Sequence, residues 1–526
     1  METESRKMPV GIQDFEKLRS EDYLYVDKTS YLYQLAKEYR PYFLARPRRF
    51  GKSLFISTLK AYFLGKKELF EGLEIVRWEK EWITYPVFHL DMNVESFTSL
   101  EMLHVALDTN LRELEWEWGG DERETTPASR LTGLIRRAHD KTGRKVVVLV
   151  DEYDKPLLST MDDEKLNATF RECLKGFYGV FKRSDAFLRF VFLTGVTKFS
   201  KVSVFSDLNQ LKDISLDNQY AGICGISEQE LLHDFKPEIA ELAKQTKRSY
   251  EATLGEIKKR YDGYHFAKKS DDMYNPFSML NMFDSMDFGN YWFKTGTPTF
   301  LAKSLKNSLY DIRTLNSEVT IEANSIDDYR AGETSLVPLL YQSGYLTIKS
   351  YNEEYDEYTL GFPNEEVRYG FLNELMPVYA PVAGLNDAFS ASRFTKTIAK
   401  GEIEGFMNQL VSFFASIPYD AIRQEHRDEQ YYQHLFYLLF TLMGQFVKAE
   451  VKSAVGRADA VVKTADSIYL FEFKMAEHAT AEEALAQIDD KGYLIPYSAD
   501  GRRLVKIGVE FAMGAKGVRR WLVKLV

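Results

Sequence analysis

Residues 42–63, YFLARPRRFGKSLFISTLKAYF, join a short apolar run, a polar loop and a helix-like stretch. The run YFLA predicts a buried strand, and SLFISTLKAYF predicts a helix. The loop between them ends in Gly51-Lys52-Ser53, which is the end of the motif G-x-x-x-x-G-K-[ST]. In this motif backbone N–H groups surround a phosphate, the lysine reaches the terminal phosphates and the hydroxyl ligates Mg²⁺.

The motif departs from its usual form at its first glycine. Arg46 stands there instead, and Pro47 stiffens the turn after it. Gly-Lys-Ser after a strand is weak evidence by itself, and an ordinary turn is an equal alternative. The residues of this loop that we assign to nucleotide binding are Arg49, Phe50, Gly51, Lys52, Ser53 and Leu54.

A second element, residues 146–150 (VVVLV), strengthens the nucleotide hypothesis. A continuous apolar run is typical of a strand buried on both faces, and this run ends at Asp151 and Glu152. Acidic residues at that end lie where α/β sheets bind ligands. We expect Asp151 to hold the Mg²⁺ shell and Glu152 to orient or deprotonate the attacking water. A simple helix cap is the alternative, and Asp91, after VFHL, is a rival position without a second carboxylate.

A third predicted strand, within residues 190–198 (FVFLTGVTK), places Thr194 near the same end of the sheet. A polar residue there could sense the γ-phosphate of a nucleotide, and a plain strand-end threonine is an equal alternative. Sites of this kind are often completed by an arginine from a neighbouring subunit. The sequence does not identify that arginine. Whether the chain forms a homo-oligomer therefore stays open.

The chain of 526 residues, 45% of them hydrophobic, is long enough for more than one buried core. Its first part alternates apolar runs with amphipathic stretches, as parallel α/β proteins do. From Ser227 the pattern becomes helical, and Ser227 and Glu230 predict a capping box. The predicted domains are 1–226, 227–380 and 390–526, with a linker at 381–389.

Charge and cysteine content limit the classes of protein. A net charge of −10 argues against a chain coated with nucleic acid, although it leaves room for a local basic groove. Cys173 and Cys224 cannot form a disulfide framework. The N-terminus lacks an apolar signal segment, and the longest apolar run, 435–446, is too short to span a bilayer. We therefore expect a cytoplasmic protein without a membrane partner.

A second constellation lies in residues 455–474, VGRADAVVKTADSIYLFEFK. Two alternating apolar runs flank a short polar turn, which predicts a β-hairpin with Ala465-Asp466 at its tip. Counting back along both strands from this turn places Asp459 opposite Glu472 on one face. Lys474 is two residues beyond Glu472 and therefore points to the same face.

Two carboxylates and a lysine around one point suit phosphodiester hydrolysis. The carboxylates can hold one or two Mg²⁺ ions, and the metal lowers the pKa of a bound water. The lysine can position that water and stabilise the developing charge. The alternative is that Glu472 and Lys474 are ordinary surface residues on an exposed strand face. The apolar neighbours of Glu472 and Lys474 instead predict a central strand, where burying both groups would be costly without a site to serve.

Two further residues are candidates for this second site. Glu429 begins the apolar helix EQYYQHLFYLLF and could be a metal ligand, although a surface glutamate is the slightly favoured alternative. Gln487, on the predicted helix after the hairpin, could contact the metal shell or the scissile phosphate.

The N-terminal part resembles the predicted AAA-ATPase-like family. The matching stretches are PVGIQDFEKLRSEDYLYVDKT, FLARPRRFGKSLFISTLKAYF, VVVLVDEYDKPL and FLTGVTKFS, followed by YNPFSMLN and YWFKTGTPTFL. In this family RPRRFGKS stands where other ATPases have a glycine-first loop, so Arg46 is a family feature. The resemblance implies that Lys52 and Ser53 bind nucleotide phosphate and Mg²⁺, with Asp151 and Glu152 as the second acidic motif.

The C-terminal part is similar to the PD-(D/E)XK nuclease superfamily domain that usually follows. Its matching stretches are EQYYQHLFYLLF, GRADAVV, YLFEFK and ALAQIDDKGY. The similarity implies nuclease roles for Asp459, Glu472 and Lys474, with Gln487 as an accessory. In the superfamily a proline often precedes the aspartate, and Ala458 replaces it here.

The expected fold is an α/β multidomain protein: a P-loop, AAA-like parallel-sheet ATPase domain, a helical middle region and a restriction-endonuclease-like α/β domain. The expected function is ATP binding and hydrolysis coupled to a metal-dependent nuclease, with ATP and Mg²⁺ as cofactors and Mn²⁺ as a substitute in the nuclease. DNA is the favoured substrate and RNA stays open, in defence or in the handling of mobile elements. The alternatives are a nucleotide-dependent interaction switch and, ranked last, an ATPase motor acting on protein.

Overall fold

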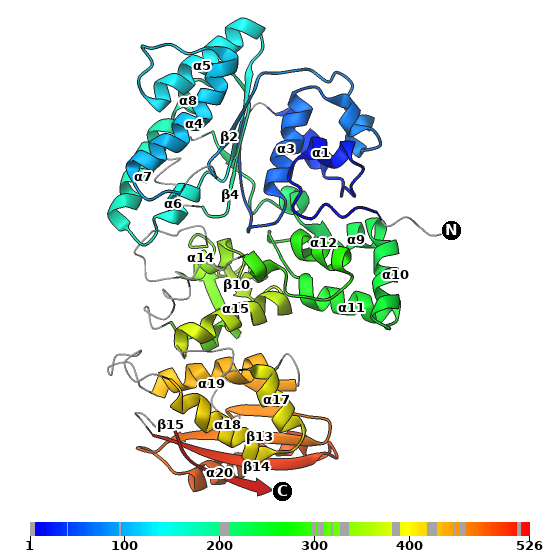
Figure 1. The fold of residues 1–526 in the computed structure, drawn as a ribbon, viewed down its shortest axis with the longest axis vertical. Coiled ribbons are helices and arrows are strands. Elements are labelled where there is room, and N and C mark those ends of the chain that lie inside the picture. The colour runs from blue at the N-terminus through cyan, green and yellow to red at the C-terminus, as the bar shows by residue number, and fades with distance from the viewer. Residues whose placement is uncertain are drawn as a thin grey trace. The chain divides into compact units, whose positions relative to one another are not determined.

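The computed structural model describes residues 6–38, 40–93, 96–198, 210–295, 301, 305, 310–316, 319–326, 336–380, 390–417, 429–444, 448–451, 458–512 and 517–526. The chain divides into two compact units (Figure 1). One consists of Met1–Thr295 with Glu318–Val367, and the other of Gly296–Ser317 with Arg368–Val526. The three domain boundaries expected from the sequence stay predictions, and the expected linker at 381–389 lies outside the described residues.

The first unit contains a five-stranded sheet whose order is β2-β3-β4-β1-β5 and whose pairs are all parallel. Its strands are β1 Pro41–Ala45, β2 Val87–Asp91, β3 Val146–Asp151, β4 Leu188–Gly195 and β5 Lys212–Asp213. The strands predicted from YFLA, VVVLV and FVFLTGVTK are confirmed as β1, β3 and β4. Because β4 lies between β1 and β3, its C-terminal end separates the ends of those two strands.

Helices cover both faces of this sheet, as the apolar runs of β3 and β4 require. Figure 1 shows α1 and α3 on one side of the strands and α4, α5 and α7 on the other. The helices of this region are α1 Phe15–Ser20, α2 Thr29–Lys37, α3 Lys52–Phe63, α4 Leu100–Trp118, α5 Pro127–Thr142, α6 Lys155–Ser159, α7 Glu164–Tyr178 and α8 Val180–Arg183. The helix predicted from SLFISTLKAYF, residues 53–63, is confirmed as α3.

The rest of the first unit is mainly helical. Ser227 and Glu230 form the predicted capping box at the start of α9, with hydrogen bonds in both directions. The helices are α9 Glu228–Asp234, α10 Lys236–Gln245, α11 Tyr250–Tyr261, α12 Pro276–Ser285, α14 Val337–Gln342 and α15 Glu365–Tyr379, the last of which continues into the second unit. The strands are β6 Ile226–Ser227, β7 Met273–Tyr274, β8 Val319–Glu322, β9 Thr347–Asn352 and β10 Glu357–Gly361.

The second unit contains a five-stranded sheet in the order β11-β12-β13-β14-β15. Only β13 and β14 pair in parallel among these strands, and the other pairs are antiparallel. The strands are β11 Lys448–Val451, β12 Ala460–Lys463, β13 Ser467–Met475, β14 Arg503–Ala512 and β15 Gly517–Leu525. The further helices of this unit are α17 Ala391–Ala399, α18 Ile403–Ala415, α19 Glu429–Met443 and α20 Ala481–Asp490.

The predicted hairpin register is confirmed. Lys463 pairs with Ile468 and Ala460 pairs with Phe471, so the next position along the two strands sets Asp459 against Glu472. The prediction of a central strand is confirmed as well, because β13 lies in the middle of the sheet.

The two faces of β13 serve different purposes. Phe471 and Phe473 point to an aromatic face, where Phe436 and Phe440 of α19 pack on them with a closest ring separation of 4.1 Å. Since side chains alternate along a strand, Glu472 and Lys474 point to the opposite face, which α20 covers. One strand thus carries core residues and candidate site residues in turn.

The close approach of α20 to β14 yields a stability prediction. A Cβ on Gly508 would lie 2.3 Å from the backbone oxygen of Ala481, so we expect Gly508→Ala to push α20 outward. The expected loss is about 1–3 kcal/mol in the free energy of unfolding of the second unit, measured by denaturant titration. Gly176→Ala is the control, because Gly176 lies in α7 with open space around it, and it should be neutral or stabilising. Equal stability of Gly508→Ala and wild type would contradict the packing described.

Candidate functional site

The buried side chain of Arg46 anchors the start of the Gly-Lys-Ser loop. Its side chain is only 2% exposed, and its guanidinium donates to the backbone oxygens of Ser215 at 2.8 Å and Tyr220 at 3.3 Å. The guanidinium also stacks on the ring of Phe266 at 4.3 Å. Burial lowers the pKa of Arg46. The residue that replaces the first glycine therefore anchors the loop to the segment after β5.

The loop then turns through two left-handed residues, Arg49 with φ 68° and Gly51 with φ 88°. Gly51 is the N-cap of α3, so the first backbone N–H groups of that helix face the loop. The ammonium of Lys52 is buried beneath the turn, where it donates to the backbone oxygens of Arg46 at 3.1 Å and Pro47 at 3.2 Å. This arrangement gathers N–H donors and a cation at one point, as phosphate binding requires.

Ser53 and Asp151 are brought together as the sequence predicts. The Ser53 hydroxyl, at the start of α3, lies close enough to the Asp151 carboxylate, at the end of β3, to lower the pKa of that carboxylate. Burial raises the pKa of Asp151 to about 6, helped by the charges of Glu152 and Asp91 and opposed by the Ser53 hydroxyl and by Lys52. A hydroxyl and a carboxylate are ligands that Mg²⁺ prefers, so the donor set fits this ion.

Glu152 adopts a strained backbone conformation beside this pair. Its φ is 51°, which is uncommon for a residue with a side chain, and such strain is concentrated at functional positions. Its carboxylate lies 3.9 Å from the ammonium of Lys52. Glu152 is therefore held facing the lysine that would contact a phosphate.

Thr194 lies between the two motifs, because it is near the end of β4. Its side chain is fully buried, and its Oγ1 has no hydrogen-bond partner among the described residues. Buried hydroxyls are normally satisfied, so this one is unusual, and the contact of Thr194 with a nucleotide stays a prediction.

Arg49 and Phe50 behave differently from the other loop residues. Arg49 donates to the backbone oxygen of Trp292 at 3.0 Å and stacks on Phe277 at 4.0 Å. Phe50 packs edge-on against Tyr264 at 4.6 Å. Both side chains hold the loop to the helical region, so a role in nucleotide binding would rest on their backbone N–H groups, as it would for the neighbouring Leu54.

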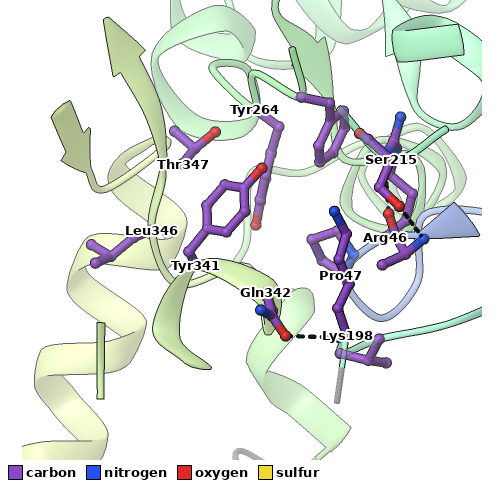
Figure 2. Close-up of a pocket in the computed structure, with 12 residues that line it drawn as sticks. Arg46, Pro47, Lys198, Ser215, Tyr264, Tyr341, Gln342, Leu346 and Thr347 are labelled. Atoms are coloured by element: carbon purple, nitrogen blue, oxygen red, sulfur yellow. Dashed lines mark hydrogen bonds between the residues drawn. The ribbon is translucent and has the colours of Figure 1, made fainter. Parts of the chain in front are cut away.

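A small pocket adjoins the start of the loop (Figure 2). Arg46 and Pro47 form part of its wall, and Figure 2 shows Gln342 directed at Lys198, whose backbone N–H it accepts at 2.8 Å. The Lys198 ammonium pairs with Asp213 at 3.1 Å. Gln342 and Lys198 therefore use their polar groups in bonds within the protein. We accordingly assign the pocket to the packing of the loop and not to ligand binding.

The second candidate site is built on β13. Glu472 is 2% exposed, and its Oε1 accepts from the Lys474 ammonium at 3.1 Å and from the Gln487 amide of α20. Asp459 accepts from the backbone N–H of Phe473 at 2.8 Å through its Oδ2. Burial, followed by the charge of Asp459, raises the pKa of Glu472. The structure therefore brings together Asp459, Glu472, Lys474 and Gln487.

The second oxygen of Glu472, Oε2, is buried without a hydrogen-bond partner in the described part of the chain. An uncompensated carboxylate oxygen beside a second carboxylate fits a divalent cation with oxygen ligands, such as Mg²⁺ or Mn²⁺. No three Asp, Glu, His or Cys side chains converge at metal-binding distance among the described residues. Glu429 begins α19, but its side chain is outside the described part, so its role as a third ligand stays a prediction.

Sequence reasoning missed two residues that support these sites. Lys506 of β14 is 4% exposed and bonds Asp489 of α20 at 2.6 Å and 2.7 Å, which holds Gln487 over Glu472. Asp154, three residues after Asp151, is fully buried. For Asp154 the sequence offers a signal, because it is the third acid in the stretch DEYD. For Lys506 no sequence pattern indicates Asp489 as its partner.

Two family models match the chain. The model described as "Predicted AAA-ATPase" matches residues 9–205, and the model described as "PD-(D/E)XK nuclease superfamily" matches residues 427–521. A relative from Azotobacter chroococcum mcd 1, named "Uncharacterized protein in vnfD 5'region", is 37% identical over 99% of each chain. Within the described ranges, every helix is too short or too polar to cross a membrane.

The raised pKa of Asp151 predicts a pH-dependent stability difference. The folded state holds the Asp151 proton more tightly than the unfolded state, so this residue's contribution to stability is lost as pH rises through about 6. Without nucleotide or metal, the free energy of unfolding of Asp151→Asn should therefore exceed that of wild type at pH 8 by about 3 kcal/mol, and the difference should vanish below about pH 4. Denaturant titration measures it. Asp140→Asn, at an exposed position in α5, is the control. A difference that does not change with pH would contradict the burial of Asp151.

The unsatisfied oxygen of Glu472 predicts metal binding. Calorimetric titration with Mn²⁺ should show one binding site fewer in Glu472→Gln than in wild type, because an amide supplies no charge to the cation. Glu404→Gln, at an exposed position in α18, should bind as wild type does. If Glu472→Gln binds as many Mn²⁺ ions as wild type does, with the same affinity, no metal site lies on β13.

Proposed function

Since the chain belongs to the predicted AAA-ATPase family and its C-terminal part matches the PD-(D/E)XK nuclease superfamily, we propose that it binds and hydrolyses ATP and that nucleotide controls a metal-dependent nuclease. The substrate of the nuclease is a phosphodiester of DNA. The observation that carries the proposal is the cluster around the buried Glu472 of β13, which keeps one unsatisfied oxygen beside the half-buried Asp459 and Lys474.

In the nuclease site, Asp459 and Glu472 would hold the divalent ion, which when bound supplies an acidic water and charge neutralisation. Lys474 already contacts Glu472 and is placed to hold the attacking water and stabilise negative charge on the phosphate. Gln487 fixes the orientation of Glu472 and would contact the metal shell or the scissile phosphate.

In the nucleotide site, Lys52 and the N–H groups at the start of α3 would bind the phosphates. Ser53 and Asp151 would hold Mg²⁺, which supplies charge neutralisation on the transferring phosphoryl group. Glu152 would orient the attacking water, and Thr194 would contact the γ-phosphate of the bound nucleotide. All five side chains lie at, or just beyond, the carboxyl ends of the parallel strands β1, β3 and β4.

The two activities would be joined by a nucleotide-dependent change of state. ATP can shift the nuclease toward an active state only by as much as its affinity differs between the two states. Such control would suit defence against foreign DNA or the handling of mobile elements in the cytoplasm, where an uncontrolled nuclease would cut the host genome.

The second candidate function is a nucleotide-dependent interaction switch whose nuclease-like domain only binds nucleic acid or protein. The net charge of −10 favours it, since phosphate backbones bind to positive surfaces. The presence of Asp459, Glu472 and Lys474 together favours the nuclease, because a domain used only for binding has no need of all three.

The proposal predicts a specific pattern of DNA cleavage. The full chain should cut supercoiled plasmid or labelled single-stranded DNA with Mg²⁺ or Mn²⁺, and Glu472→Gln should lower cutting to background. Lys52→Ala should leave metal binding intact and remove the effect of ATP on the rate, because it removes the phosphate-binding cation. Gel assays over time with and without ATP measure both effects.

The controls separate the two parts of the proposal. Glu404→Gln should cut as wild type does, and a labelled RNA of the same sequence tests the choice of substrate. Equal cutting by wild type and Glu472→Gln would exclude β13 as the source of the activity. An unchanged cutting rate and DNA affinity upon addition of ATP would exclude the coupling and leave the two domains independent.

A further inference from the structure

Asp154 is a buried carboxylate that the mechanism above does not use. It lies at the start of α6, three residues after Asp151, and its side chain is 0% exposed. Its Oδ2 accepts three hydrogen bonds from the segment after β4: from the backbone N–H of Val196 at 3.0 Å, and from the N–H and hydroxyl of Thr197 at 2.6 Å and 2.7 Å.

A buried carboxylate with only neutral donors is costly. No lysine, arginine or histidine within the described residues forms an ion pair with Asp154, and burial raises its pKa to about 6. The charge of Glu152 raises this pKa further, whereas Lys52 lowers it. A neutral asparagine or serine could accept the same bonds at a lower desolvation cost, so the charge calls for a reason beyond capping.

Other bonds join the same segments into one block. Tyr153 donates its backbone N–H to the oxygen of Thr194 at 3.1 Å and its hydroxyl to the oxygen of Thr197 at 2.7 Å. Arg46 donates its backbone N–H to the oxygen of Gly195 at 3.2 Å. The ends of β1, β3 and β4 are therefore tied together directly behind the nucleotide loop.

Gly195 is required by this block. A Cβ at this position would lie 2.3 Å from Asp154 Oδ1, so only glycine allows the carboxylate to lie against the strand. Asp154 Oδ1 has no hydrogen-bond partner among the described residues, and the Oγ1 of the adjacent Thr194 has none either. Two unsatisfied buried oxygens thus lie in this block, both beside Gly195 at the C-terminal end of β4.

We propose that Asp154 is a positioning residue of the nucleotide site, which holds Thr194 and Glu152 in register with Lys52 so that a bound nucleotide is hydrolysed. This inference rests on the ATPase function proposed above. The charged carboxylate binds its three donors more strongly than a neutral group would, and therefore fixes the segment after β4 relative to the acids after β3. Misplacement of a water-orienting group by a fraction of an ångström lowers the rate of reaction without removing phosphate binding.

Asp154→Asn in the full chain tests the proposal. Asparagine retains an oxygen for Val196 and Thr197, so the fold should be kept, while the charge is removed. We expect kcat for ATP hydrolysis to fall by about 10- to 100-fold, with the Kd of a fluorescent ATP analogue changed by less than about threefold. Thr197→Val, which removes one of the three donors, should lower kcat in the same sense by a smaller factor. Asp162→Asn, exposed in the turn before α7, should leave kcat unchanged.

The possible outcomes are distinguishable. A kcat of Asp154→Asn within about twofold of wild type would overturn the positioning role while leaving the ATPase proposal intact. A parallel loss of nucleotide affinity, kcat and thermal stability would also overturn it, since it would show a purely structural carboxylate. Wild type that binds the analogue through Lys52 but does not hydrolyse ATP would refute the ATPase proposal and this inference together.

Discussion

The buried guanidinium of Arg46 is the interaction on which the nucleotide loop depends. It joins the end of β1 to the backbone oxygens of Ser215 and Tyr220, which lie far along the chain. An anchored arginine side chain thus takes the place of the flexible glycine that usually begins such a loop. Enclosing a cation here costs free energy, which the carbonyl dipoles and the face of Phe266 offset. Because the start of the loop is fixed, Lys52 is delivered under the turn and within reach of the acids after β3. The loop thus obtains its shape from distant contacts and its chemistry from its last three residues.

The nuclease-like site follows a different rule, since its geometry arises from strand periodicity. A single strand, β13, must pack aromatic rings on one face and present Glu472 and Lys474 on the other. A shift of one residue in the hairpin would place both charges in the aromatic core, so the register is strongly determined by the hydrophobic effect. The polar face is then completed by α20, which Lys506 and Asp489 dock and which carries Gln487 to Glu472. Core packing on one face of β13 therefore fixes the position of the site residues on the other face.

The sequence predicts the local features and cannot predict the distant ones. The strands, the capping box at Ser227 and the hairpin that opposes Asp459 and Glu472 depend on residues close in sequence, and the structure confirms them. The position of Thr194 between the two nucleotide motifs depends on the order of strands in the sheet, which no local pattern encodes. The same holds for the partners of Arg46 and for the three donors of Asp154, which come from other parts of the chain. Composition likewise cannot show that Arg49 would turn toward the helical region.

Both candidate sites hold carboxylates whose protonated forms the folded chain favours. Burial raises the pKa of Asp151 and of Asp154 to about 6, and it raises that of Glu472. At neutral pH the ionised groups therefore cost folding free energy, which the rest of the structure must supply. A cation that binds the ionised form offsets this cost, and by linkage it stabilises the fold in proportion to its binding free energy. The same carboxylates that weaken the chain alone would thus make its stability depend on the proposed metal ions.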